Sequence, residues 1–89
     1  MSNGAYEVRI TTKAAKDLRQ LPEKVAAACV EFLFGPLAEN PHRVGKPLHG
    51  EFQGLHTARR SSYRVVYAIH DHAVTIEVAR IAHRADAYR

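Results

Sequence analysis

RRSSYRVVY, residues 59–67, joins the most regular strand pattern of the chain to three arginines. Within it Tyr63, Val65 and Tyr67 alternate with Arg64 and Val66, which is the period of a strand with one buried face. The stretch therefore predicts the middle of a β-sheet that packs its apolar side chains inward. Its arginines would face an anionic partner.

Three strand-like runs predict an antiparallel meander around this stretch: Leu55 to Arg60, Tyr63 to His70 and Ala73 to Ile81. If Ser61-Ser62 is a two-residue turn, Arg59 lies opposite Arg64 and Arg60 lies opposite Tyr63. Two like charges directly opposite each other are unfavourable, so the first pair makes sense if an anion comes between them.

The second connection, Asp71-His72, sets the register of the last strand. Treated as a two-residue turn, it places Ala79 opposite Arg64. The same count puts Arg80 on the core side of the sheet, unless a bulge at Ala79-Arg80 re-aims its side chain. Arg80 is therefore the weaker functional candidate.

The first part of the chain predicts a strand followed by a helical hairpin. Residues 6–10 alternate in polarity as a half-buried strand does, and Thr11 or Thr12 is placed to cap the next helix. Apolar residues at helical spacing support two helices, the first ending before Pro22 and the second reaching Gly35-Pro36. Leu37 and Ala38 could extend the second helix by a turn, and residues 39–54 are expected to form an irregular loop.

These elements predict one α+β domain over residues 1–89, with the strand and helical hairpin packed on an antiparallel sheet of about four strands. A length of 89 residues and a hydrophobic content of 46% allow one modest core. No apolar run approaches the roughly 20 residues of a membrane span, and the N-terminus lacks the features of a signal peptide. We therefore expect a cytoplasmic protein without a membrane partner.

Charge is concentrated in the second half of the chain. Residues 1–41 carry five Lys/Arg and five Asp/Glu, whereas residues 42–89 carry eight Lys/Arg, four Asp/Glu and all six histidines. Such a basic half suits a polyanion, such as nucleic acid or an acidic protein segment. The single cysteine, Cys29, lies in an alanine-rich helical pattern and is expected to be a small buried hydrophobe rather than a nucleophile.

The residue types favour chemistry on phosphates. Arginine offers a fork of donors that grips phosphate oxygens, and no hydrolase or nucleotide-binding motif is present. Cleavage of RNA by its own 2′-hydroxyl needs only such cations and a group that moves a proton. His83, Arg84 and Tyr88 at the end of the chain are placed to help, whereas His42, His70 and His72 are expected to be solvated. No cofactor and no metal site are predicted.

Four short motifs carry a resemblance to a known family: KPLHG at 46–50, GLHTAR at 54–59, YRVVY at 63–67 and HRADAY at 83–88. Together they resemble the RelE/ParE toxin superfamily, nearest to the RelE-type toxins of bacterial toxin–antitoxin modules. The resemblance implies a RelE-like fold, with a possible short C-terminal helix. It also implies a ribosome-dependent endonuclease that cuts mRNA in the A site by 2′-hydroxyl attack.

The resemblance assigns roles residue by residue. Arg64 matches the arginine that grips the scissile phosphate, Arg84 a tail arginine that donates a proton or binds phosphate, and Tyr88 a tail tyrosine that stacks or transfers a proton. Arg59 matches a basic strand residue. Leu55 and Thr57 stand where RelE toxins carry two lysines, so the general base passes to His49, His83 or Arg59. The residues expected to bind RNA are Lys46, His49, Thr57 and His83.

The implied partners are a RelB-like antitoxin, the ribosome and mRNA, with DNA reached only through the antitoxin. Two alternatives remain open. One is a ParE-like inhibitor of DNA gyrase, which shares the fold without using the cations as catalysts. The other is a toxin that has lost its activity and retains only antitoxin binding.

Overall fold

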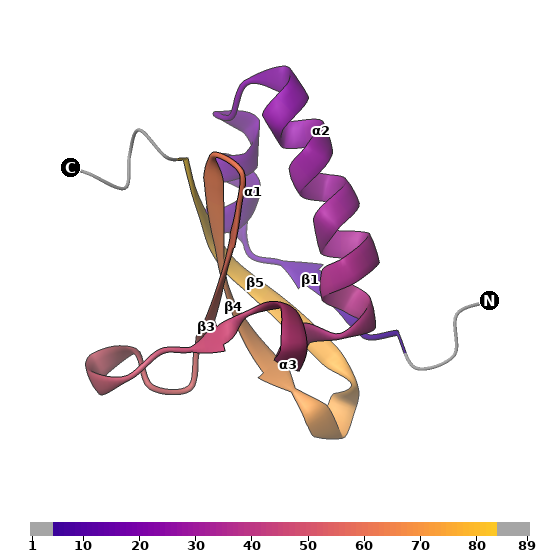
Figure 1. Ribbon diagram of the computed structural model, residues 1–89, viewed down its shortest axis with the longest axis vertical. Helices are drawn as coiled ribbons and strands as arrows, with labels where there is room; N and C mark the ends of the chain where they lie inside the picture. Colours follow the sequence, from indigo (N-terminus) through magenta and orange to yellow (C-terminus); the bar gives the residue numbers. More distant parts are fainter. Residues whose placement is uncertain (1–4, 84–89) are drawn as a thin grey trace.

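The computed structural model describes residues 5–83, which form one mixed sheet with helices packed against a single face (Figure 1). In chain order the elements are β1 (Glu7–Ile10), α1 (Thr12–Arg19), α2 (Glu23–Phe32), η1 (Leu33–Leu37), α3 (Pro41–Val44), β2 (Lys46–Pro47), η2 (Gly50–Phe52), β3 (His56–Arg60), β4 (Tyr63–His70), η3 (Asp71–Ala73) and β5 (Thr75–His83). The α+β class and the helical hairpin are confirmed. In these residues no helix combines the length and the apolarity needed to cross a membrane.

The sheet differs from the sequence prediction in two respects. Its strand order is β1-β5-β4-β3-β2, and β1 runs parallel to β5 while the other pairs are antiparallel. Alternation along residues 7–10 shows which face is buried but carries no information on strand direction. The segment 39–54 is also not a plain loop, because it contains α3, the short fifth strand β2 and η2.

The second helix continues past Gly35-Pro36. This agrees with the possibility, noted from the sequence, that Leu37 and Ala38 extend it by a turn. The segment Leu33–Leu37 is a π-helical turn with Pro36 inside it, and helical geometry persists to Glu39. Proline has no N–H, and in an α-helix its ring clashes with the preceding turn. A wider π turn accommodates the ring without ending the helix.

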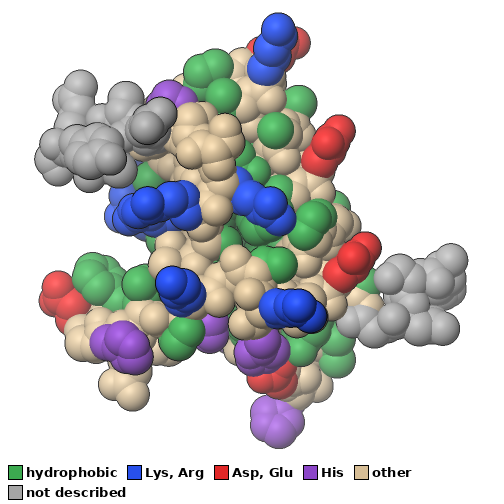
Figure 2. All heavy atoms as spheres, viewed as in Figure 1, with side chains coloured by type: hydrophobic (Ala, Val, Ile, Leu, Met, Phe, Trp, Pro, Cys, Tyr) green, Lys and Arg blue, Asp and Glu red, His purple; other side chains and the backbone are tan. Residues whose placement is uncertain are grey.

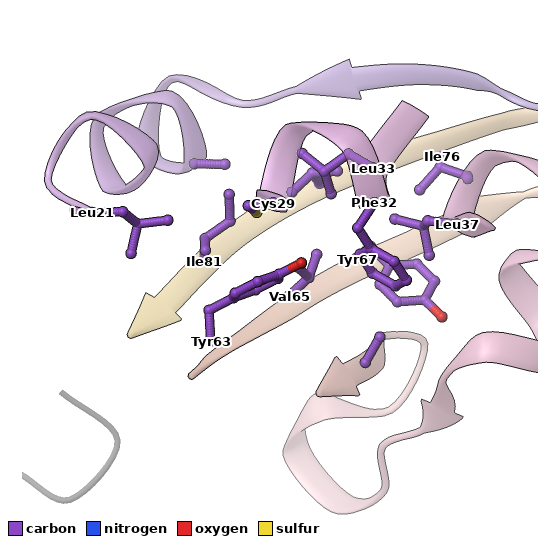
Figure 3. Packing of buried hydrophobic residues seen from close by; sticks show 13 residues of the cluster. Leu21, Cys29, Phe32, Leu33, Leu37, Tyr63, Val65, Tyr67, Ile76 and Ile81 are labelled. Carbon is purple, nitrogen blue, oxygen red and sulfur yellow. The ribbon is translucent and has the colours of Figure 1, made fainter. Parts of the chain in front are cut away.

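The core lies between the helices and one face of β4 and β5 (Figure 3). From the sheet come alternate residues of β4, Tyr63, Val65 and Tyr67, together with Ile76 and Ile81 of β5. They meet a helical stripe formed by Cys29, Phe32, Leu33 and Leu37. Cys29 is fully buried, and burial raises the pKa of its thiol to about 11, which leaves it inert at neutral pH.

Tyr67 anchors the segment after the helices to the sheet. Its buried hydroxyl donates a hydrogen bond of 2.7 Å to the carbonyl oxygen of Pro41. Gly45 lies directly against that hydroxyl, and a Cβ built on Gly45 would also stand 2.7 Å from the carbonyl oxygen of Thr57. Only a residue without a side chain fits between Tyr67 and β3 here.

We predict that Gly45→Ala destabilises the fold by about 1–3 kcal/mol, because the added methyl overpacks this contact. Gly35→Ala is the matched control, since nothing lies within 4 Å of its added Cβ. It should be neutral or stabilise the helix by about 0.5–1 kcal/mol. Urea unfolding of the three proteins measures both effects, and equal midpoints for Gly45→Ala and the wild type would contradict the close approach.

On the edge that faces β1, the end of β5 is bonded by two side chains rather than by a strand: those of Thr11, the N-cap of α1, and Asp17 in α1. β1 pairs with β5 only up to Ile10 opposite Val78. Beyond that point Thr11 donates from Oγ1 to the carbonyl oxygen of Ala79 at 2.9 Å. The backbone N–H of Ile81 donates to Oδ2 of Asp17, also at 2.9 Å. These two bonds, which we call the α1 clamp, satisfy the backbone on either side of Arg80.

Asp17 is buried and ionised within this clamp. Burial acts to raise its pKa, but hydrogen bonds from Lys13 Nζ and the Ile81 N–H, with the nearby charges of Lys13 and Arg80, hold the pKa below its usual value. Because the folded pKa lies below the unfolded value, the charged carboxylate stabilises the fold. This contribution is complete above the unfolded pKa and is lost as pH falls through the folded one.

We predict that Asp17→Asn lowers the free energy of unfolding by about 1–3 kcal/mol at pH 7, because the amide cannot accept both bonds. The difference from the wild type should shrink below about pH 4, where the carboxyl group begins to protonate. Urea midpoints from pH 3 to pH 7 test this, with Glu31→Gln as a control on the exposed side of α2. A difference in stability that stays constant with pH would contradict the stabilising role of an ionised Asp17.

Candidate functional site: a cation face on the sheet

The predicted register of the central hairpin is confirmed. Arg59 lies opposite Arg64, and Arg60 lies opposite Tyr63. Arg60 therefore points to the helix side, where its guanidinium sits 4.5 Å from the centre of the Phe32 ring. Arg59 and Arg64 share the opposite face of the sheet.

The predicted register of β5 is wrong. Ala82, not Ala79, lies opposite Arg64. Two features of the connection cause the difference. The turn takes four residues, 71–74, with Val74 in the left-handed region at φ 48°, and a bulge interrupts the pairing between Val66 and Tyr67.

The bulge brings Arg80 to the face of the sheet that carries Arg59 and Arg64, although the sequence count had placed it on the core side. Val66 pairs with Arg80 and Tyr67 pairs with Val78, so Ala79 is the extra residue of the bulge. Arg80 is exposed, whereas Val78 and Ile81 on either side of the bulge are both buried. The odd spacing of Val78 and Ile81 was the sequence signal that could have identified this change of phase.

We define the cation face as the uncovered side of β2 to β5, whose basic members are Lys46, Arg59, Arg64 and Arg80. Figure 2 shows Lys and Arg side chains grouped over the centre of this view of the molecule. Within residues 5–83, none of these four cations forms an ion pair. The outer-face positions of β3 and β4 are exposed or half-buried, and none is buried.

Thr57 lies within the cation face, next to Lys46. The two residues are opposite each other on β3 and β2. The Oγ1 atom of Thr57 is shielded from solvent and has no hydrogen-bond partner in the described part of the chain. Thr57 is thus an uncharged residue between Lys46, opposite it on β2, and Arg59, two residues later on β3. Lys46 is exposed. His49 is exposed in the loop that follows β2.

His83 does not join the arginines. It lies opposite Tyr63, whose side chain is in the core, so its position faces the helix side of the sheet. Arg64 and Ala82 occupy the next positions on the other face. The expected C-terminal helix, Arg84 and Tyr88 lie outside the described residues.

His42 and His56 lie away from the cation face, whereas His70 is on the same side of β4 as Arg64, with its Nε2 3.4 Å from Oε1 of Glu77. His56 stacks on Tyr67 with ring centroids 5.6 Å apart, and burial, then the nearby His42, lowers its pKa and favours the neutral ring. His42 lies 2.9 Å from Oδ1 of Asp71, which also accepts a 2.7 Å hydrogen bond from Tyr6. These bonds, that of His42 first, lower the pKa of Asp71. Residues 5–83 contain no group of three His, Cys, Asp or Glu arranged to hold a metal ion.

The cation face is suited to binding phosphates. Opposite positions on antiparallel strands are about 4.5–5.5 Å apart at Cα, so the guanidinium groups of Arg59 and Arg64 can reach one anion. An anion between them removes the repulsion that the pair otherwise suffers. In a transition state of phosphate chemistry, the same groups would stabilise the added negative charge.

Comparison with known proteins places the chain among bacterial toxins. The family described as ParE toxin of type II toxin–antitoxin system, parDE, matches residues 8–88. Toxin RelE of Mycobacterium tuberculosis is 61% identical over 84 residues, which cover 94% of this chain and 87% of that protein. Toxin RelG of the same organism is 51% identical, with 94% and 97% covered.

Solved structures agree with the fold. A chain of the toxin–antitoxin complex RelBE2 from M. tuberculosis superposes with a TM-score of 0.91 and 48% identity, covering 96% of this chain and 98% of that one. The isolated E. coli RelE toxin, at 23% identity and a TM-score of 0.72 with 94% and 92% covered, shares the fold. The chain therefore belongs to the RelE/ParE family of toxins from type II toxin–antitoxin systems.

Proposed function

We propose that this toxin is a ribosome-dependent mRNA endonuclease, acting in the cytoplasm on the codon in the A site. The observation that carries the proposal is the pair formed by Arg59 and Arg64 on the uncovered face of the sheet. Two arginines held opposite each other by backbone pairing are suited to a phosphate whose charge increases during reaction. The similarity to RelE-named toxins over most of the chain supports the same function.

In the proposed reaction the 2′-hydroxyl of the RNA attacks the adjacent phosphorus, and the 5′-oxygen of the next nucleotide leaves. Arg64 grips the scissile phosphate, and Arg59 shares its negative charge. Arg84 or Tyr88, by resemblance, returns a proton to the leaving oxygen. His83 is a poor candidate for the base, because its strand position faces away from the arginines. His49 and Arg59 remain the candidates among the described residues.

The proposed partner in the resting cell is a RelB-like antitoxin. An acidic segment laid over the cation face would neutralise its charge and exclude RNA. The similar solved structures include a toxin–antitoxin complex, RelBE2 of M. tuberculosis. The toxin would reach DNA only through this partner.

We predict that Arg64→Gln lowers the rate of mRNA cleavage by about 100-fold or more, because one donor to the developing charge is lost. The measurement is mapping of new mRNA 5′ ends in a purified translation system. Arg19→Gln, at an exposed position in the last turn of α1, is the matched control and should cleave as the wild type does.

The match to the ParE family favours DNA gyrase inhibition as the second candidate. The same preparation of toxin separates the two functions. Intact mRNA together with toxin-dependent breaks in gyrase-treated plasmid would replace the proposal by gyrase inhibition. Intact mRNA and intact plasmid would identify a toxin that retains only antitoxin binding.

A further inference from the structure

The strand alternation of β5 by itself would direct Arg80 into the core. Ile76 and Val78 face the helices, so the second residue after Val78 should face them as well. A buried arginine without a partner is strongly unfavourable. The bulge at Ala79 changes the phase by one residue, so that Ile81 fills the core position and Arg80 is exposed on the cation face.

This change of phase is held in place from outside the sheet. The α1 clamp bonds the carbonyl oxygen of Ala79 through Thr11 and the N–H of Ile81 through Asp17. The bonded groups belong to the two residues that flank Arg80. Lys13 in turn holds Oδ1 of Asp17 at 2.6 Å. A bulge fixed on both sides gives the backbone of Arg80 a defined direction.

Register then places Arg80 relative to the other cations. Arg80 lies opposite Val66, Val66 opposite Thr57, and Thr57 opposite Lys46. This row is charged only at its two ends. The neighbouring row holds Arg59, Arg64 and Ala82.

Arg80 is therefore a diagonal neighbour of Arg64, one row along on the adjacent strand. Such diagonal positions are about 7–8 Å apart at Cα, within reach of long side chains. Arg64 thus has Arg59 directly opposite it and Arg80 diagonally beside it. The charges of Glu7 and Arg9 on β1 lie farther across the sheet and form their own 3.7 Å pair.

We propose that Arg80 is an RNA-binding residue, which holds the phosphate next to the one gripped by Arg59 and Arg64. The inference rests on the proposed function for its ligand, a single strand of RNA. Two phosphates held on adjacent rows of a rigid sheet would fix the path of the strand. That path sets which 2′-hydroxyl faces the scissile phosphate. Arg80 is thus assigned to substrate positioning, and the proton transfers remain with other groups.

The test is equilibrium binding of a short single-stranded RNA over a series of salt concentrations. Every 2′-hydroxyl of this RNA is replaced by a 2′-O-methyl group, so that binding is measured without cleavage. Each phosphate contact in a single strand contributes about 0.7 to the slope of log affinity against log salt. Arg80→Gln should lower the slope by about this amount and weaken binding about tenfold at low salt. Arg19→Gln should keep the wild-type slope.

A rescue variant tests whether RNA binding needs a cation in this row of the sheet rather than an arginine at position 80. The double variant Thr57→Lys/Arg80→Gln returns a cation to the row of the sheet from which Arg80 was removed. This double variant should recover most of the lost slope. Unchanged urea midpoints for Arg80→Gln would show that the exposed substitution leaves the fold intact.

Each outcome decides one proposal. If Arg64→Gln lowers the slope and Arg80→Gln does not, this inference fails and the proposed function stands. If both lower the slope while translated mRNA stays intact, the proposed function fails and the RNA contact stands. If Arg80→Gln weakens only the binding of an acidic antitoxin peptide, the residue contacts protein rather than RNA. A slope that falls equally in Arg19→Gln would reduce the effect to net charge and overturn the inference.

Discussion

Strand β4 is bonded on both sides, to β3 and to β5, and its alternation sets the two surfaces of the sheet. Tyr63, Val65 and Tyr67 must be removed from water, so the helices cover their face. The side chain of Arg64 then necessarily lies on the other face. Because both properties come from one period of two residues, a substitution that shifted the register of β4 would exchange the core and the cation face together.

Much of this could be read from the sequence because it depends on local pattern. A two-residue turn at Ser61-Ser62 fixes the pairing of Arg59 with Arg64 by counting alone. The same count places Arg60 on the opposite face from Arg59, and in the structure its guanidinium lies there over the Phe32 ring. Helical spacing likewise identified the stripe that meets the sheet, including Cys29, whose burial needs no knowledge of its neighbours.

The errors arose where the deciding contacts are distant in sequence. The parallel pairing of β1 joins residues more than sixty positions apart, and no pattern within either strand encodes it. The bulge at Ala79 depends on Thr11, which is 68 positions away. The face on which His83 lies depends on distant contacts for the same reason, since it follows from the number of residues in the turn and bulge that precede it.

The bulge connects stability to the cation face. The α1 clamp holds backbone groups through the N-cap residue of α1, Thr11, and through Asp17 within that helix. Without the clamp, β5 beyond Val78 would be an open sheet edge, and regular pairing with β4 would turn Arg80 toward the core. Burying that charge is unfavourable, so the arginine itself also favours the bulge. Arg80, Thr11 and Asp17 therefore support one another, and the geometry of the cation face depends on a helix that does not contribute to its surface.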